Sequence, residues 1–308
     1  MNILISGASG LIGSALASHL AGNQHRVFRM IRRKPAAAGE IAWDPASETL
    51  DKSAVEGMDA VVHLAGTNLA SGRWTAERKR SIRESRIAGT LFLAQSLARL
   101  FDPPKVFVSV SAIGYYGNGG DSELVEESPS GKGFLADLCR EWETATEPAS
   151  ARHIRVVIPR LGMVLSPGGG ALRLMLPIFR LGAGGRIGSG RQYMSWIAID
   201  DLVGVIDHAI HCEGLRGPVN AVSPNPVTNQ VFSKTLGAVL SRPALFALPA
   251  FAARLALGQM ADEVLLSGAR VSPAKLTGSG YSFVFPHLEG ALRHVLKRPG
   301  KNSAPLRG

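Results

Sequence analysis

The chain has 308 residues, of which 45% are hydrophobic and 19% charged, and its formal net charge is +10. These proportions are ordinary for a soluble globular protein that can bury a large core. The positive charge favours an anionic ligand, but no run of five basic residues occurs, so we expect no nucleic-acid partner.

Two further features bear on the compartment. The longest apolar stretch, residues 244–258, is interrupted by Pro249 and Arg254 and is too short to span a bilayer, so we expect no membrane partner. Cys139 and Cys212 are isolated from each other and from histidine-rich spacing, which indicates buried thiols and neither a disulfide nor a metal site. No basic leader precedes the first apolar residues. We therefore expect a cytoplasmic protein without a bound metal.

Strand and helix patterns alternate from the beginning of the chain. Apolar runs predict strands at 2–6, 26–31, 59–65, 105–111 and 154–158. Amphipathic periodicity predicts helices at 11–21, 76–101 and 133–147. Such alternation indicates βαβ units and hence a parallel sheet with helices on both faces.

The pattern loosens after residue 165. Residues 166–195 are rich in glycine and include a helical piece near 171–181. An apolar helix at 248–257 is followed by 260–266, by the aromatic segment 281–285 and by a helix at 287–297. We predict a core at 1–165, a pocket-forming region at 166–242 that also completes the core, a small C-terminal lobe at 243–298 and a flexible tail at 299–308.

A glycine-rich turn joins the first strand to the first helix: Gly7-Ala-Ser9-Gly10-Leu11-Ile12-Gly13. The first glycine permits a tight turn, the second lets the backbone approach a pyrophosphate, and the third allows close packing of helix on strand. A diphosphate then lies at the helix N-terminus, where unpaired N–H groups favour negative charge. The fold class expected is therefore α/β, a Rossmann-type doubly wound parallel sheet with a smaller C-terminal substrate lobe.

The end of the second strand indicates which dinucleotide binds. An NAD enzyme usually carries Asp or Glu there for the ribose 2′-hydroxyl, whereas this strand ends in Ile31-Arg32-Arg33-Lys34. Arg32 and Arg33 suit the 2′-phosphate of NADP(H), with Arg32 the main candidate. The alternative is a solvated basic strand end.

These residues resemble the extended short-chain dehydrogenase/reductase superfamily. The resemblance includes the glycine turn, Asp59-xxx-His63-Leu64-Ala65-Gly66, Ser109-xx-Ala112 and Trp196-Ile-Ala-Ile-Asp200-Asp201. More narrowly, the chain is similar to a subfamily of nucleoside-diphosphate-sugar epimerases, also described as cell-division-inhibitor homologues. That similarity lies in Ser85-Arg86-xx-Gly89-Thr90, Ser111-Ala-Ile-Gly-Tyr-Tyr-Gly117, Ile187-Gly-Ser-Gly-Arg-Gln192 and Gln259-Met-Ala-Asp-Glu-Val-Leu-Leu-Ser-Gly-Ala-Arg270.

The resemblance implies roles for particular residues. Leu64, Ala65 and Gly66 would line the diphosphate or ribose, and Arg86 would help clamp it. Ser109, Val110 and the residues up to Ala112 would lie alongside the nicotinamide, and residues around Arg160 would cover the nicotinamide end of the cofactor. Small strand-end hydroxyls and a solvated helix arginine are the alternatives for Ser109 and Arg86.

The superfamily's proton-transfer pair, Tyr-xxx-Lys, is missing. Residues four places after the four tyrosines are Gly119, Gly120, Ile197 and Phe285, and the expected helix carries Phe134 and Leu138 instead. If hydride transfer occurs, Ser111 and Tyr116 are the candidate catalytic residues, because Tyr116 is the phenol nearest to Ser111 in sequence. The alternative is that Tyr115 and Tyr116 are walls of the pocket.

Two classes of function follow. The first is an NADP(H)-dependent oxidoreductase or epimerase acting on a small molecule such as a nucleotide sugar. Its substrate pocket would include Tyr115, Arg191, Gln192 and Trp196. The second is a non-catalytic protein that binds NADP(H) and responds to it. A division-machinery or peripheral membrane partner ranks last, and no sequence feature specifies an oligomeric state.

Overall fold

A parallel β-sheet forms the centre of the protein. The computed structural model describes residues 1–67, 69 and 72–298. The sheet order is β14-β9-β6-β5-β1-β2-β3-β4, and β7 pairs with β9 beside this path. All of these pairings are parallel except that of β3 with β4. The strands are β1 (Asn2–Ser6), β2 (Arg26–Ile31), β3 (Glu40–Asp44), β4 (Thr49–Leu50), β5 (Ala60–His63), β6 (Val106–Ser109), β7 (Ser111–Ala112), β9 (Arg155–Leu161) and β14 (Gly217–Ala221).

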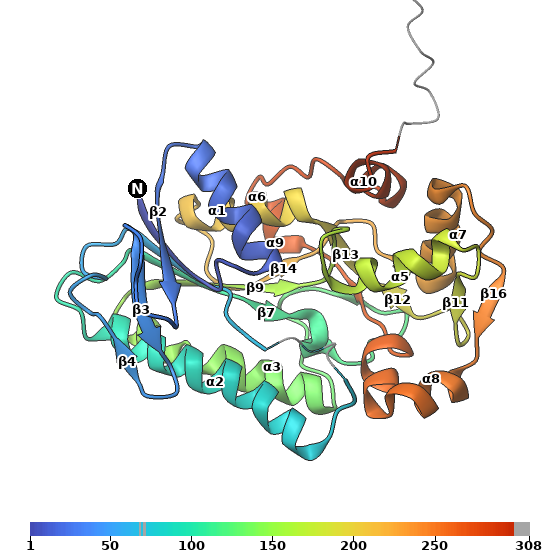
Figure 1. The fold of residues 1–308 in the computed structure, drawn as a ribbon, viewed down its shortest axis with the longest axis horizontal. Helices are drawn as coiled ribbons and strands as arrows, with labels where there is room; N and C mark the ends of the chain where they lie inside the picture. The colour runs from blue at the N-terminus through green and yellow to red at the C-terminus, as the bar shows by residue number, and fades with distance from the viewer. Residues whose placement is uncertain (68, 70–71, 299–308) are drawn as a thin grey trace, which may run out of the picture.

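Helices cover both faces of this sheet (Figure 1). Side chains alternate along each strand, so Ile3 and Ile5 pack with α1 (Leu11–Gly22) and α6 (Ile199–His211). Leu4 points to the other face, where it joins Leu93 and Leu97 of α2 (Ala76–Ala98). On this second side α3 (Phe134–Thr144) lies beside α2 (Figure 1), and α4 (Glu147–Ala151) contributes Ala149 to the same cluster. The predicted doubly wound α/β class is confirmed.

Shorter elements build the other end of the molecule. Two-stranded pairs join β10 to β13, β11 to β16, β12 to β15 and β8 to β17. These strands are β8 (Glu123–Leu124), β10 (Met163–Leu165), β11 (Gly185–Ile187), β12 (Tyr193–Met194), β13 (Trp196–Ala198), β15 (Val227–Thr228), β16 (Phe246–Leu248) and β17 (Arg270–Val271). The helices are the 3₁₀ turn η1 (Ile113–Tyr116), α5 (Gly170–Arg180), α7 (Asn229–Leu240), α8 (Ala250–Leu257), the π-helical turn η2 (Ala261–Leu265), α9 (Ala274–Gly278) and α10 (Leu288–Val295).

The C-terminal residues pack on the rest of the protein at several places. Leu276 of α9 lies in the same core cluster as β1 and α6. Met260 lies in a second cluster with Trp74 and with Leu138 of α3. Leu292 of α10 joins a third cluster with α5 and α7. The predicted division at residues 165, 242 and 298 stays a prediction, but the C-terminal segment shares its core with both earlier regions.

The observed elements differ from those expected in particular places. The antiparallel pair β3 and β4 lies between residues 40 and 50, where no strand was predicted. The predicted helix 133–147 is divided, with α3 ending at Thr144 and α4 beginning at Glu147 before Pro148. Among residues 1–67, 69 and 72–298, no helix combines the length and the apolarity that crossing a membrane requires.

Candidate functional site

The glycine turn lies at the carboxyl edge of β1, beside the segment that follows β5. Gly7 has φ +68°, and a Cβ there would be 2.9 Å from the carbonyl carbon of Leu64. A Cβ on Gly13 would be 2.2 Å from the Gly7 oxygen, well inside any allowed contact. Glycine is therefore required at both positions, once for backbone conformation and close approach and once for helix packing.

The helix that follows presents its N-terminus at the same edge. Gly10 caps α1 without a side-chain hydrogen bond, and the first turn contains Leu11, Ile12, Gly13 and Ser14. The turn therefore adds no carboxylate to the positive end of the helix dipole. A Cβ on Gly169 would meet the Leu11 side chain at 3.1 Å, so the loop after β10 passes close to this turn. The backbone from Ser9 to Ile12 is suited to hold an anion.

A buried serine–histidine pair holds the segment after β5 against β1. The Ser6 hydroxyl accepts hydrogen bonds from the backbone N–H groups of Leu64 (3.1 Å) and Ala65 (3.3 Å). Because the Ser6 oxygen already accepts these two hydrogen bonds, its O–H donates to His63 Nδ1 at 2.7 Å. This arrangement requires a neutral imidazole. Burial lowers the pKa of His63 to about 4, so the ring is neutral at physiological pH.

Arg86 of α2 is a buried cation at this edge. Its guanidinium donates to the Thr67 carbonyl at 2.9 Å and stacks 5.1 Å from the Trp142 ring. Burial lowers its pKa to about 10, which leaves it charged at neutral pH. Among the described residues no carboxylate forms an ion pair with Arg86, and its Nε has no hydrogen-bond partner. A Cβ on Gly66 would lie 3.4 Å from its guanidinium carbon, so the charge lies directly beside the predicted diphosphate segment.

The two arginines after β2 have different surroundings. Arg33 forms an ion pair with Glu40 of β3. Arg32 is exposed and makes no hydrogen bond or ion pair with any residue that the structure describes; its charge is one of the influences that lower the pKa of Asp44, after the hydrogen bonds from Ser47 and Ala46. Arg32 is thus available to a ligand, whereas Arg33 would have to give up its partner.

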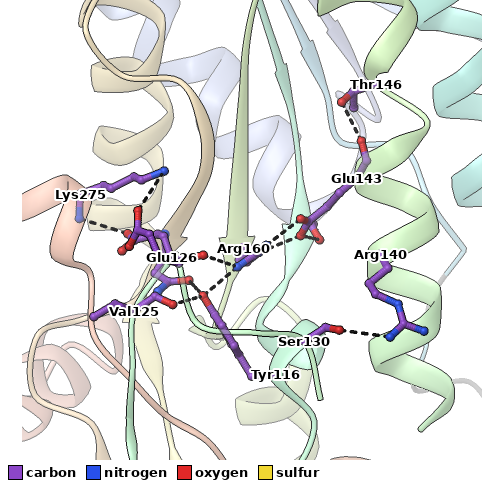
Figure 2. A network of polar contacts seen from close by, with 12 residues as sticks. Tyr116, Val125, Glu126, Ser130, Arg140, Glu143, Thr146, Arg160 and Lys275 are labelled. Carbon is purple, nitrogen blue, oxygen red and sulfur yellow. Dashed lines mark hydrogen bonds and ion pairs between the residues drawn. The ribbon is translucent and has the colours of Figure 1, made fainter. Parts of the chain in front are cut away.

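Ser109 and Val110 are buried at the end of β6, and the Ser109 hydroxyl has no partner among the described residues. Ser111, two residues on, donates to Glu143 of α3 at 2.8 Å. The same carboxylate receives two hydrogen bonds from Arg160, each at 2.8 Å (Figure 2). Burial alone would lower the pKa of Arg160, but these bonds to Glu143 raise it. Ser111 and Arg160 therefore both belong to a buried ion-pair network.

This network changes how Arg160 and Tyr116 are interpreted. The remaining Arg160 nitrogen, Nη1, donates to the Tyr116 hydroxyl at 2.9 Å and to the Glu126 carbonyl at 3.2 Å. The Tyr116 hydroxyl in turn lies 2.7 Å from Asn220 Oδ1 and 3.0 Å from the Val125 carbonyl. Burial raises the pKa of Tyr116. This geometry argues against the expectation that its hydroxyl turns toward the sheet edge as a proton donor. It also engages four of the five Arg160 N–H groups within the network, which leaves one N–H on Nη2.

Tyr115 differs from its neighbour in one respect that matters for chemistry. Its ring lies over the Arg160 guanidinium, with 3.5 Å between the guanidinium carbon and the ring centroid. The side chain is only partly buried, and its hydroxyl makes no hydrogen bond to a described residue. Tyr115 is therefore the phenol near Ser111 whose hydroxyl is not already used.

The three expected pocket residues of the glycine-rich region separate in the structure. Trp196 is fully buried in the core with Leu165 and Phe232, so it lines no open pocket. Gln192 donates to the carbonyls of Ile187 (3.0 Å) and Leu265 (2.8 Å). Its side chain therefore links the glycine-rich region to the C-terminal segment. Arg191 is exposed and remains available to an anionic substrate.

Sequence reasoning missed a carboxylate at the helix that should carry Tyr-xxx-Lys. Glu263, in the C-terminal segment, accepts from the backbone N–H groups of Phe134 (3.2 Å) and Leu135 (2.8 Å). It thereby caps the N-terminus of α3 from more than a hundred residues away. On that helix Cys139 is buried, and burial raises its pKa to about 11, so its thiol stays protonated. The acidic residue inside the segment 259–270 was the available signal.

Comparison with known proteins identifies the family to which this chain belongs. Residues 3–219 match the NAD dependent epimerase/dehydratase family, and residues 248–295 match a domain of unknown function, DUF1731. The chain belongs to the NAD dependent epimerase/dehydratase family. This family assignment confirms the resemblance to extended short-chain dehydrogenases/reductases.

Full-length relatives share both segments of this family member. An epimerase family protein of Mycobacterium leprae is 45% identical over 300 residues, covering 97% of each chain. The human epimerase family protein SDR39U1 is 37% identical over 299 residues, covering 96% of this chain and 100% of the human one. The crystal structure of the human protein (isoform 2) with NADPH has a TM-score of 0.89 at 36% identity and covers 96% of this chain and 99% of its own.

Proposed function

We propose that this epimerase-family chain binds NADP(H) at the carboxyl edge of β1, β2 and β5. The observation that carries the proposal is the combination of a glycine turn with no room for a Cβ and an exposed Arg32 just after β2 that makes no hydrogen bond to a described residue. The buried charge of Arg86 supports it, because an unpaired buried cation is costly unless a ligand supplies negative charge. The human relative crystallised with NADPH is consistent with this preference.

The reaction we propose is that of an oxidoreductase or epimerase acting on a small molecule. Bound NADP(H) would supply the hydride, while Arg191 offers a cation to an anionic group and Tyr115 offers the available phenol. The substrate class we propose is a nucleotide sugar. Distant members of the fold, such as MoeE5 at 19% identity, were crystallised with UDP-glucuronic acid and NAD. The site of action is the cytoplasm, where Cys139 and Cys212 remain thiols.

A second candidate is a non-catalytic protein that responds to NADP(H). It is favoured by the network of Ser111, Glu143, Arg160 and Tyr116, which uses the polar groups near the superfamily's catalytic position for structure. If the protein is an enzyme, it should turn over a carbonyl or sugar substrate. A protein that binds NADPH tightly but shows no turnover across nucleotide sugars would favour the second candidate.

Calorimetric titration tests the binding proposal. We expect NADPH to bind more tightly than NADH by about tenfold or more, since one charge-assisted hydrogen bond contributes about 1.5–3 kcal/mol. Arg32→Ala should remove most of this preference. Arg33→Ala is the matched control and should change it less, because Arg33 is already bound to Glu40. Equal affinities of the unmodified protein for the two cofactors would contradict the proposal.

A further inference from the structure

A cluster of histidines and one aspartate lies at the amino edge of the sheet, opposite the glycine turn. It is formed by His19 near the end of α1, His25 just before β2, and Asp207 and His211 in the second half of α6. His19 Nε2 lies 2.9 Å from Asp207 Oδ2, and His211 Nδ1 lies 3.1 Å from Asp207 Oδ1. One nitrogen or oxygen atom each from His25, Asp207 and His211 lies within 4.8 Å of the others.

These separations are close to those of a transition-metal site. Zinc bound tetrahedrally at about 2.0–2.1 Å holds its ligand atoms roughly 3.3 Å apart. The pairs formed by Asp207 with His19 and His211 are close to that spacing, and His25 needs a movement of at most about 1.5 Å to join them. Asp207 and His211 are four residues apart on α6, which places both side chains on the same face of the helix.

The polar groups of the cluster are incompletely satisfied without a cation. Asp207 Oδ1 is buried and makes no hydrogen bond among the described residues, and its one recorded contact there is the 3.1 Å ion pair with His211 Nδ1, which also lies 2.9 Å from the Asp207 backbone carbonyl. A buried carboxylate oxygen with an unused lone pair is a natural metal ligand.

We propose that His25, Asp207 and His211 form a binding site for a divalent transition metal of the zinc class, with His19 as a fourth ligand. Imidazole and carboxylate ligands suit this class. The ion would join the end of α1 and the turn before β2 to α6, elements that pack together on one face of the sheet. Its role is a structural clamp on that face. The sequence predicted no metal because these ligands come from three separate segments and follow no local motif.

Zinc titration of the untagged full-length protein tests the site. We expect calorimetry in a non-chelating buffer at pH 7.5 to show one Zn²⁺ per chain with a dissociation constant below about 10 µM. Zinc should also raise the melting temperature, since it binds the folded state selectively. Asp207→Asn and His211→Ala should each weaken binding about tenfold or more. His208→Ala is the matched control, because that neighbouring imidazole contacts Ser279 instead and its loss should leave zinc affinity unchanged.

The outcomes separate this proposal from the one for NADP(H). Binding weaker than about 10 µM, or binding that Asp207→Asn and His211→Ala do not alter, would show adventitious contact with surface histidines and overturn the site. Titrating NADPH with and without saturating zinc should give the same affinity, because the two sites lie at opposite edges of the sheet. The metal site thus stands or fails independently of the dinucleotide.

Discussion

Two adjacent tyrosines show how position alone leaves a side chain's role undecided. The sequence places Tyr115 and Tyr116 at the same sheet edge, after the same strand, and nothing local distinguishes them. In the structure the hydroxyl of Tyr116 joins Arg160 and Asn220, whereas that of Tyr115 makes no such bond. The difference arises from residues contributed by β9 and β14, which sequence spacing cannot bring together. The sequence therefore identifies the two tyrosines near Ser111, but it does not show which of the two hydroxyls is available for chemistry.

Replacing each tyrosine by phenylalanine separates the two roles. Tyr116→Phe should lower the free energy of unfolding by about 1–3 kcal/mol, since it leaves buried polar partners unsatisfied. Tyr115→Phe should change stability by less than about 0.5 kcal/mol. Where turnover is measurable, Tyr115→Phe should lower the rate by roughly 10²–10⁴-fold if that phenol transfers the proton. Urea denaturation measures the first effect, and a Tyr116→Phe protein as stable as the parent would contradict the structural role.

At the scale of elements, the contact between the ends of β1 and β5 depends on a neutral imidazole. Ser6 pairs with His63 in the strand register. The Ser6 hydroxyl can accept hydrogen bonds from Leu64 and Ala65 in this geometry only while His63 accepts the hydrogen bond that the hydroxyl donates. A protonated ring would donate instead and break this arrangement. The folded-state pKa of His63, about 4, is below the unfolded value of 6.5. As pH falls below 6.5, the unfolded chain binds a proton that the folded chain does not, so stability decreases until about pH 4.

The size of this effect gives a measurable pH dependence. Between pH 7.5 and 5.0 we expect His63 to contribute a loss of about 2 kcal/mol in the free energy of unfolding. His63→Asn keeps an acceptor for Ser6 but does not titrate, so its stability should depend less on pH by about that amount. Urea titrations of both proteins at the two pH values measure the difference. Parallel pH profiles for the parent and the variant would show that His63 is not responsible.

The strands and helices of the central sheet were predictable because continuous apolar strands and amphipathic helices leave a strong periodic pattern. The short elements were not, because β8, β12 and β17 contain two residues each and exist only through pairing with distant segments. The site divides in the same way. Gly7 and Gly13 were predictable because only glycine fits the turn that their spacing indicates. The places of Trp196 and Glu263 depend on tertiary packing, which the sequence does not show.

For the molecule as a whole, the C-terminal segment is structurally part of the core. Glu263 caps α3, and β17 pairs with β8. The Ser195 hydroxyl donates to the Ala269 carbonyl and accepts from the Val271 N–H group. Leu276 is fully buried beneath the sheet's α1 and α6 face. Removing the segment would expose several apolar clusters at once and leave buried polar groups without partners.

A chain ending at residue 242 should therefore be insoluble or lack a cooperative unfolding transition. About sixty residues alone bury too small a fraction of their surface to be reliably stable, so the released segment is not expected to fold by itself either. The matched control ends at residue 298, retains every described residue and should melt at the temperature of the full chain. Thermal unfolding followed by circular dichroism compares the three proteins. If the chain ending at 242 unfolds cooperatively at an unchanged midpoint, the C-terminal segment is a separable lobe and its contacts with α3, β8 and the sheet contribute little to stability.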